Sequence, residues 1–258
     1  MSQKISLFTS LEFKLPGIVH AFFGRTGGVS EGYYDSLNCS FINKEDPLDR
    51  VLENRRRALE ALTPQVTHLC LNEQIHSPIV QSITALPHVC AKADGMVTNL
   101  SHVALGIQTA DCVPILFSCE KTKVIGACHA GWKGALAGIV GNTVAAMKDL
   151  GASNAAIRAV VGPCIAQASY DVGPEFYDNF VNAHSENDRF FTPTAANKFL
   201  FDIRGYVHYR LEEAGLVHIS HVRHDTCAEE DHFFSNRRRT IRGEPTFGGQ
   251  ISMIAKVT

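Results

Sequence analysis

Residues 103–134 read VALGIQTADCVPILFSCEKTKVIGACHAGWKG, and this stretch decides the fold. It contains three short apolar runs, at residues 103–107, 114–118 and 124–129, each followed by a turn. Apolar runs of about 4–8 residues have the length of a buried β-strand and are short for a helix. We therefore expect three strands here, in the core of the protein.

The pattern continues on both sides of this stretch. Further runs of strand length lie at residues 18–23, 66–71, 79–83 and 156–162, and the six runs between 66 and 162 form the predicted core. Helical spacing occurs at residues 47–62, 134–150 and 201–214, and the last two of these segments end at Gly151 and Gly215. Asp46 is expected to cap the first helix, with Pro47 at its first position.

Strands and helices interleave along the chain, but two hairpin-like strand pairs precede the helix at 134–150. This order favours an α/β fold of the mixed (α+β) type, a layered sandwich with a mixed β-sheet core flanked by helices. No linker rich in Pro, Gly or Ser interrupts the chain, and no repeat divides it. We expect a single domain over residues 1–258.

Composition excludes several classes of protein. The net charge of −2 gives no basic surface for nucleic acid, and the short run Arg237-Arg238-Arg239 is interpreted as a solvated loop or a local anion contact. The sequence has neither a secretory signal pattern nor an apolar stretch long enough for a membrane helix, so we expect a cytoplasmic protein. Its eight scattered cysteines are then expected to be free thiols.

Polar residues gather after three of the predicted strands, in residues 72–76, 108–114 and 127–134. Loops at strand ends converge on ligand sites in α/β proteins. These segments supply His76, Cys112 and His129, and imidazole nitrogen and thiolate sulfur both suit Zn²⁺. Three protein ligands leave the fourth zinc position open, as in catalytic sites.

Two other interpretations use the same residues. Cys112 could be a small buried core residue, with His76 and His129 as ordinary turn histidines, because the spacing is not that of a compact metal motif. Alternatively, Cys112 could be a nucleophile and His129 its base, as in a Cys/His hydrolase. Lys133 precedes the helix at 134–150 and is either a phosphate contact or a solvated lysine.

The sequence resembles the YfiH/YlmD family, also called the multicopper polyphenol oxidase (laccase) or peptidoglycan editing factor family. The resemblance rests on ordered motifs along nearly the whole chain: FGRTGGVS at 23–30, SLN at 36–38, QIH at 74–76, ADGMVT at 93–98, TADCVP at 109–114, HAGW at 129–132, GPCI at 162–165 and FFS at 233–235. Two positions depart from the family pattern, Ser77 in place of Gly and Lys133 in place of Arg. Lysine keeps the charge of arginine but loses its bidentate fork.

The resemblance implies a compact sandwich with one zinc ion per chain, bound by His76, Cys112 and His129. It further implies phosphorolysis of adenosine, inosine and S-methyl-5'-thioadenosine, together with adenosine deaminase activity, so the partners are a purine nucleoside and phosphate. For these substrates we expect contacts from the side chains of Arg25, Asn38, Gln74 and Lys133.

Zinc-assisted deamination also needs an acid to carry the proton, for which Asp111 and Glu73 are candidates. Copper is expected to be secondary, because one three-ligand site cannot house several copper centres. The competing functions are a Cys112/His129 hydrolase that edits peptidoglycan precursors, a copper-dependent polyphenol oxidase, and a non-catalytic binding module.

Overall fold

The computed structural model describes residues 4–42, 44–195 and 197–258. Within these residues the strands form two large sheets and one small sheet. The five-stranded sheet contains, in spatial order, β1 (Leu7–Phe8), β2 (Ile18–Phe23), β14 (Gln250–Lys256), β6 (Val103–Thr109) and β3 (His68–Cys70). The six-stranded sheet contains β13 (His218–His221), β9 (Ile157–Val161), β7 (Val113–Cys119), β8 (Ile125–Ala130), β5 (Gly95–Thr98) and β4 (Val80–Ile83). The small sheet contains β10 (Asp171–Val172), β12 (Phe199–Phe201) and β11 (Phe191–Pro193).

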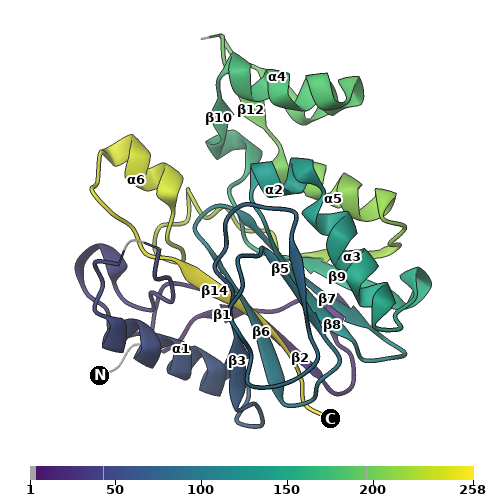
Figure 1. Cartoon of the computed structure of the whole chain (residues 1–258). Coiled ribbons are helices and arrows are strands. Elements are labelled where there is room, and N and C mark those ends of the chain that lie inside the picture. The colour runs from purple at the N-terminus through teal and green to yellow at the C-terminus, as the bar shows by residue number, and fades with distance from the viewer. Residues whose placement is uncertain (1–3, 43, 196) are drawn as a thin grey trace.

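The two large sheets pack face to face between helices, giving four layers (Figure 1). Buried side chains from both sheets share one core, including Leu105 of β6, Leu116 of β7 and Ile254 of β14. The helices are α1 (Leu48–Leu62), α2 (Trp132–Ala137), α3 (Ile139–Asp149), α4 (Pro174–Ala183), α5 (Ile203–Glu213) and α6 (Asn236–Arg242). Helix α1 covers the outer face of the five-stranded sheet, where Ala58 meets Phe23 and Met253 in a second cluster.

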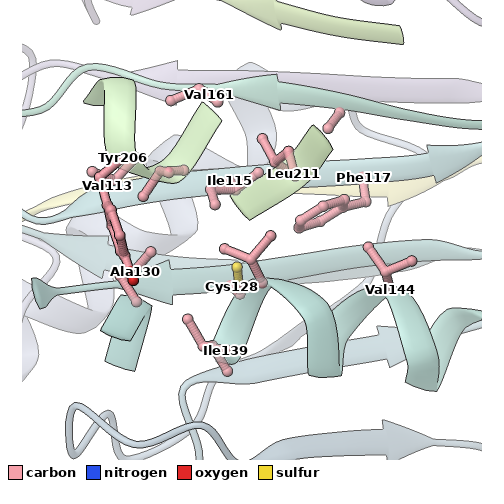
Figure 2. Close-up of a cluster of buried hydrophobic side chains, with 14 of the residues drawn as sticks. Val113, Ile115, Phe117, Cys128, Ala130, Ile139, Val144, Val161, Tyr206 and Leu211 are labelled. Atoms are coloured by element: carbon pink, nitrogen blue, oxygen red, sulfur yellow. The ribbon is translucent and has the colours of Figure 1, made fainter. Parts of the chain in front are cut away.

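Helices α3 and α5 cover the outer face of the six-stranded sheet (Figure 2). Ile115 and Phe117 project from β7 toward this layer, where they meet Ile139 of α3 and Leu211 of α5. These side chains are fully buried. Since both sheets are covered on both faces, their central strands are apolar throughout rather than alternating.

The predicted layered mixed α/β sandwich is confirmed, with one difference in its arrangement. The six predicted core strands all exist but are divided between two sheets, β3 and β6 in one and β4, β7, β8 and β9 in the other. Both sheets are mixed, because the pairs β3–β6, β4–β5 and β9–β13 are parallel and the others are antiparallel. The eight cysteines are free thiols, as expected. In the described parts of the chain, no helix has the length and apolar character needed to cross a membrane.

Three helix predictions need correction. The segment 134–150 forms two helices instead of one, because Gly138 takes a left-handed conformation (φ 100°) that ends α2. The predicted helix at 201–214 begins only at Ile203, where the Asp202 side chain caps it by accepting a bond from the backbone of Gly205. Asp46 does not cap α1: its carboxylate instead accepts hydrogen bonds from Ser30 and Asn38.

His20 makes the stability of the sandwich sensitive to pH. It lies on β2 with its side chain buried, and its Nε2 accepts a hydrogen bond from the backbone of Ser10 at 3.1 Å. Burial lowers the pKa of His20 from 6.5 to about 4. As the pH falls below 6.5, His20 therefore binds a proton in the unfolded chain but stays neutral in the folded protein. The free energy of unfolding decreases until the pH reaches about 4, where folded His20 is protonated as well.

We expect the wild type to lose about 2 kcal/mol more unfolding free energy between pH 7.5 and pH 5 than His20→Gln. Glutamine retains an acceptor for Ser10 but does not titrate. Urea unfolding at both pH values measures the difference, and equal losses in the two proteins would show that His20 is not the source.

Candidate metal centre

The three predicted ligands meet where the chain crosses from one large sheet to the other. Strand β6 ends at Thr109 in the five-stranded sheet, and β7 begins at Val113 in the six-stranded sheet, so Cys112 lies on the crossing. His129 is carried by β8 and pairs in register with Pro114 of β7. His76 comes from the loop between β3 and β4, and its φ of 59° is unusual for a residue other than glycine. The close packing of the two sheets thus assembles the cluster.

The geometry of the cluster suits a zinc ion. One potential ligand atom from each of His76, Cys112 and His129 lies within 4.8 Å of the others. The Cys112 Sγ is 3.8 Å from Nε2 of His76, close to the roughly 3.6 Å that separates sulfur and nitrogen ligands around tetrahedral zinc. His129 is buried and His76 is exposed, so the cluster is accessible from the His76 side. The donor set and the spacing both fit Zn²⁺.

Asp94 holds two of the ligands in place. Its fully buried carboxylate accepts a hydrogen bond from Nδ1 of His129 at 2.8 Å, which leaves Nε2 of that ring free for a metal. The same carboxylate accepts bonds from the backbone N–H groups of Ile75, His76 and Ser77 and from the Ser77 hydroxyl. Burial alone would raise the pKa of Asp94, but the bonds from His129 and Ser77 outweigh it and lower the pKa to about 2. Asp94 is therefore a carboxylate that fixes both the loop and the ring.

Cys112 and His129 each favour the charged form of the other. Burial opposes the charge on Cys112, but His129 and His76 outweigh it and lower the pKa of the thiol to about 6. Burial also opposes the charge on His129, but Cys112 and Asp94 raise the pKa of the imidazole to about 9. At neutral pH the sulfur is thus a thiolate, the form that binds a metal and also the form that attacks an electrophile.

Gly131 allows the cluster to close. A Cβ atom at this position would lie 2.5 Å from Cδ2 of His76 and 3.1 Å from Sγ of Cys112. Any side chain here would therefore push two ligands aside. The glycine that follows His129 and Ala130 is needed for this close approach.

The two predicted proton carriers lie in different environments. Asp111 is buried, and its carboxylate accepts hydrogen bonds from Thr226, Ser235 and the backbone of Arg237, at 2.7, 2.9 and 2.6 Å. Burial raises the pKa of Asp111, against the opposing effect of these bonds. Glu73 is exposed, on the loop that carries His76. Asp111 thus anchors the chain segment around residues 226–237 to the turn that bears Cys112.

Two of the four predicted substrate contacts, Asn38 and Arg25, bond to residues outside the segments that carry the metal ligands. Asn38 is fully buried, and its amide bonds to Asp46, Ser40 and Gly249, so it stabilises the fold around β14. Arg25 donates to the backbone oxygens of Asp35 and Glu230 and lies over the ring of Phe234.

Gln74 and Lys133 are the other two predicted contacts. The Gln74 amide pairs with the backbone N–H and carbonyl of Gln108, which fixes the start of the His76 loop against the end of β6. Lys133 is exposed, and its Nζ lies 5.4 Å from the centre of the Trp132 ring. Of the four, Gln74 and Lys133 lie on the segments that carry metal ligands.

Asp94 is a functional residue that was not predicted from the sequence. It lies directly before β5 in the motif at 93–98, and the pairing of Gly95 with Cys128 brings it beside His129. The sequence feature that could have indicated its role is a charged residue within the otherwise mostly apolar motif ADGMVT at 93–98. The pairing of β5 with β8 that gives it a role is not visible in the sequence.

Replacing Asp94 should weaken zinc binding without removing a ligand. In Asp94→Asn we expect zinc affinity to fall about 10–100-fold, because the hydrogen bond that orients His129 loses its charge. Competition with a chromogenic chelator measures the affinity. The matched control is Asp46→Asn, which alters another buried, hydrogen-bonded carboxylate whose recorded partners, Ser30 and Asn38, lie outside the cluster. Equal affinities in the two variants would contradict the role given to Asp94.

Adding one methyl group at Gly131 should also disturb the cluster. We expect Gly131→Ala to bind zinc substoichiometrically, because the new Cβ overlaps the ring of His76. The control is Gly141→Ala on α3, where the added Cβ has no atom within 4 Å. Zinc content after purification is the measurement, and full occupancy in Gly131→Ala would refute this geometry.

Comparison with known proteins places the chain in a family. Residues 19–256 match the family model described as multi-copper polyphenol oxidoreductase laccase. A Rickettsia prowazekii protein named purine nucleoside phosphorylase is 38% identical, covering 86% of this chain and 89% of its own length. The purine nucleoside phosphorylase YfiH of Escherichia coli K12 is 32% identical over 88% of this chain and 91% of its own length.

Solved structures of similar proteins agree with this result. A Neisseria meningitidis protein superposes with a TM-score of 0.84 at 28% identity, covering 99% of both chains. YlmD from Geobacillus stearothermophilus gives a TM-score of 0.83 at 28% identity, covering 96% of this chain and 94% of that chain. The chain therefore belongs to the multi-copper polyphenol oxidoreductase laccase family, which includes the YfiH and YlmD proteins.

Proposed function

We propose that this protein is a zinc-dependent purine nucleoside phosphorylase that acts on adenosine, inosine and S-methyl-5'-thioadenosine and also deaminates adenosine. The observation that carries the proposal is the cluster of His76, Cys112 and His129, supported by Asp94 and accessible from one side. The names of the relatives from Rickettsia and Escherichia support the phosphorylase part of this proposal.

In phosphorolysis, an oxygen of phosphate forms a bond to C1′ of the ribose while the bond from C1′ to N9 of the purine breaks. The electron pair of that bond goes to the purine, which takes up a proton. A bound zinc ion would supply a Lewis acid at the accessible side of the cluster. The protein's own part is positional: Asp94 keeps Nδ1 of His129 protonated, and Gln74 holds the loop of His76 against β6.

In deamination, a water oxygen adds to C6 of adenosine and ammonia leaves, so a proton must pass from the water to the leaving amine. Both oxygens of Asp111 already accept hydrogen bonds. The candidates for the transfer are still Asp111, directly before Cys112, and Glu73, exposed on the loop that carries His76.

A second candidate function is favoured by one observation. Cys112, His129 and Asp94 have the order of a nucleophile, a base and an orienting acid, and the thiol pKa is lowered by His129 and His76 to about 6 against the effect of burial. Such a set would serve a hydrolase that edits peptidoglycan precursors. It assigns no task to His76, whereas the zinc proposal uses all three side chains. Copper oxidation is the weaker third candidate, because the described residues hold one three-ligand cluster.

The deciding experiment combines metal analysis with turnover. In protein purified without added metal we expect about one zinc per chain, with ribose 1-phosphate and adenine formed from adenosine and phosphate. Inosine formed in parallel would reveal deamination. His76→Ala and Cys112→Ala should lose both metal and turnover, because each removes a ligand.

Cys119→Ala is the matched control, since this buried cysteine lies at the other end of β7 and should leave metal and activity unchanged. A metal-free wild type without purine turnover would reject the proposal. Loss of a hydrolytic activity on alkylation of Cys112, with no effect of chelators, would favour the Cys/His hydrolase.

A further inference from the structure

A row of three aromatic side chains starts directly beside the metal cluster and ends at Arg237. Trp132 follows Gly131, and its ring centre lies 4.8 Å from that of Phe176, which in turn lies 5.8 Å from that of Tyr170. A cation stands at each end of the row: Lys133 over Trp132 at 5.4 Å, and the guanidinium of Arg237 over Tyr170 at 5.2 Å. Both cations are therefore candidates to hold an anion near the cluster.

Arg237 is tied to the cluster more firmly than Lys133. Its backbone N–H donates to Asp111 at 2.6 Å, and Asp111 directly precedes Cys112. Lys133 is exposed and held mainly by its ring contact. The backbone of Arg237 is thus held beside a metal ligand, while its side chain contacts Tyr170 and Asp171.

The charges around Arg237 leave room for an anion. Asp171 accepts from Arg237 at 3.1 Å with one oxygen and from Lys198 at 2.6 Å with the other. Lys198 and Arg237 together hold the pKa of Asp171 below its ordinary value, so it is a carboxylate. Arg237 and Lys198 thus share the single negative charge of Asp171, and these three side chains together carry a net positive charge. The side chain of Arg237 is 25% exposed, which gives solutes access to it.

We propose that Arg237 binds the phosphate co-substrate and presents it to the nucleoside at the metal cluster; this inference rests on the proposed function. A guanidinium offers two parallel N–H donors to phosphate, which fix its orientation as well as its charge. An oxygen of that phosphate forms the bond to C1′ as the bond to N9 breaks. The Tyr170 ring packs against the guanidinium, and Asp171, itself bound by Lys198, orients it.

The test is the dependence of phosphorolysis on inorganic phosphate in zinc-loaded protein. In Arg237→Gln we expect the KM for phosphate to rise about 10–100-fold, because a charge-assisted contact is lost, with the KM for adenosine and the zinc content unchanged. Arg237→Lys should recover part of the affinity. Arg239→Gln is the matched control, because Arg239 lies on the same helix but contacts Asn236 and Phe247.

Three outcomes would overturn the inference. These are an unchanged KM for phosphate in Arg237→Gln, an equal rise in the KM for adenosine, or loss of zinc from that variant, since the last two indicate a purely structural role. A rise in Lys133→Gln alone would move the phosphate to the other end of the row. If the wild type does not turn over nucleosides, the proposed function fails, and calorimetric titration of the wild type and Arg237→Gln with phosphate still decides whether Arg237 binds this anion.

Discussion

The buried carboxylate of Asp94 is the constraint on which the rest of the site depends. Burying a carboxylate away from water costs free energy unless its oxygens accept hydrogen bonds from the protein. Here the donors are the backbone of Ile75, His76 and Ser77, the Ser77 hydroxyl, and the ring of His129. Three successive backbone N–H groups can point at one carboxylate only if the loop curls around it. The carboxylate therefore shapes the loop that presents His76. The Asp94 side chain thus positions two ligands, His76 on that loop and His129 on β8.

The sandwich supplies the third ligand through a topological feature. The turn between β6 and β7 leaves the five-stranded sheet and enters the six-stranded one, as does the loop between β3 and β4 that carries His76. Asp111 takes a φ of 88° within this turn, and Thr226, Ser235 and Arg237 hold it there. Strained backbone persists where surrounding contacts over-determine it. The second carboxylate of the site thus anchors Cys112 as the first anchors the histidines.

Local patterns in the sequence were sufficient to place the ligands but not their supports. His76, Cys112 and His129 each follow or end an apolar run, so strand ends could be identified without knowing which strands pair. Asp94 acquires its role from the pairing of β5 with β8, and Arg237 acquires its partner Asp171 from β10, which is distant in the chain. The central strand β14 was missed for a related reason. Ile251 and Met253 face α1 while Ile254 faces the other sheet, so the two faces of β14 find their partners in segments far away in the sequence.

The conformation of His76 distinguishes between the two chemistries that the same atoms permit. For a Cys112 nucleophile with His129 as base and Asp94 as orienting acid, the position of His76 would be free to vary. The chain instead holds His76 in the left-handed region, a conformation that costs on the order of 1–3 kcal/mol when strained. Glycine at 131 leaves room for its ring, and its Nε2 lies 3.8 Å from the sulfur. This arrangement gives the Cys112 hydrolase nothing, whereas the proposed metal site uses His76 as its third donor.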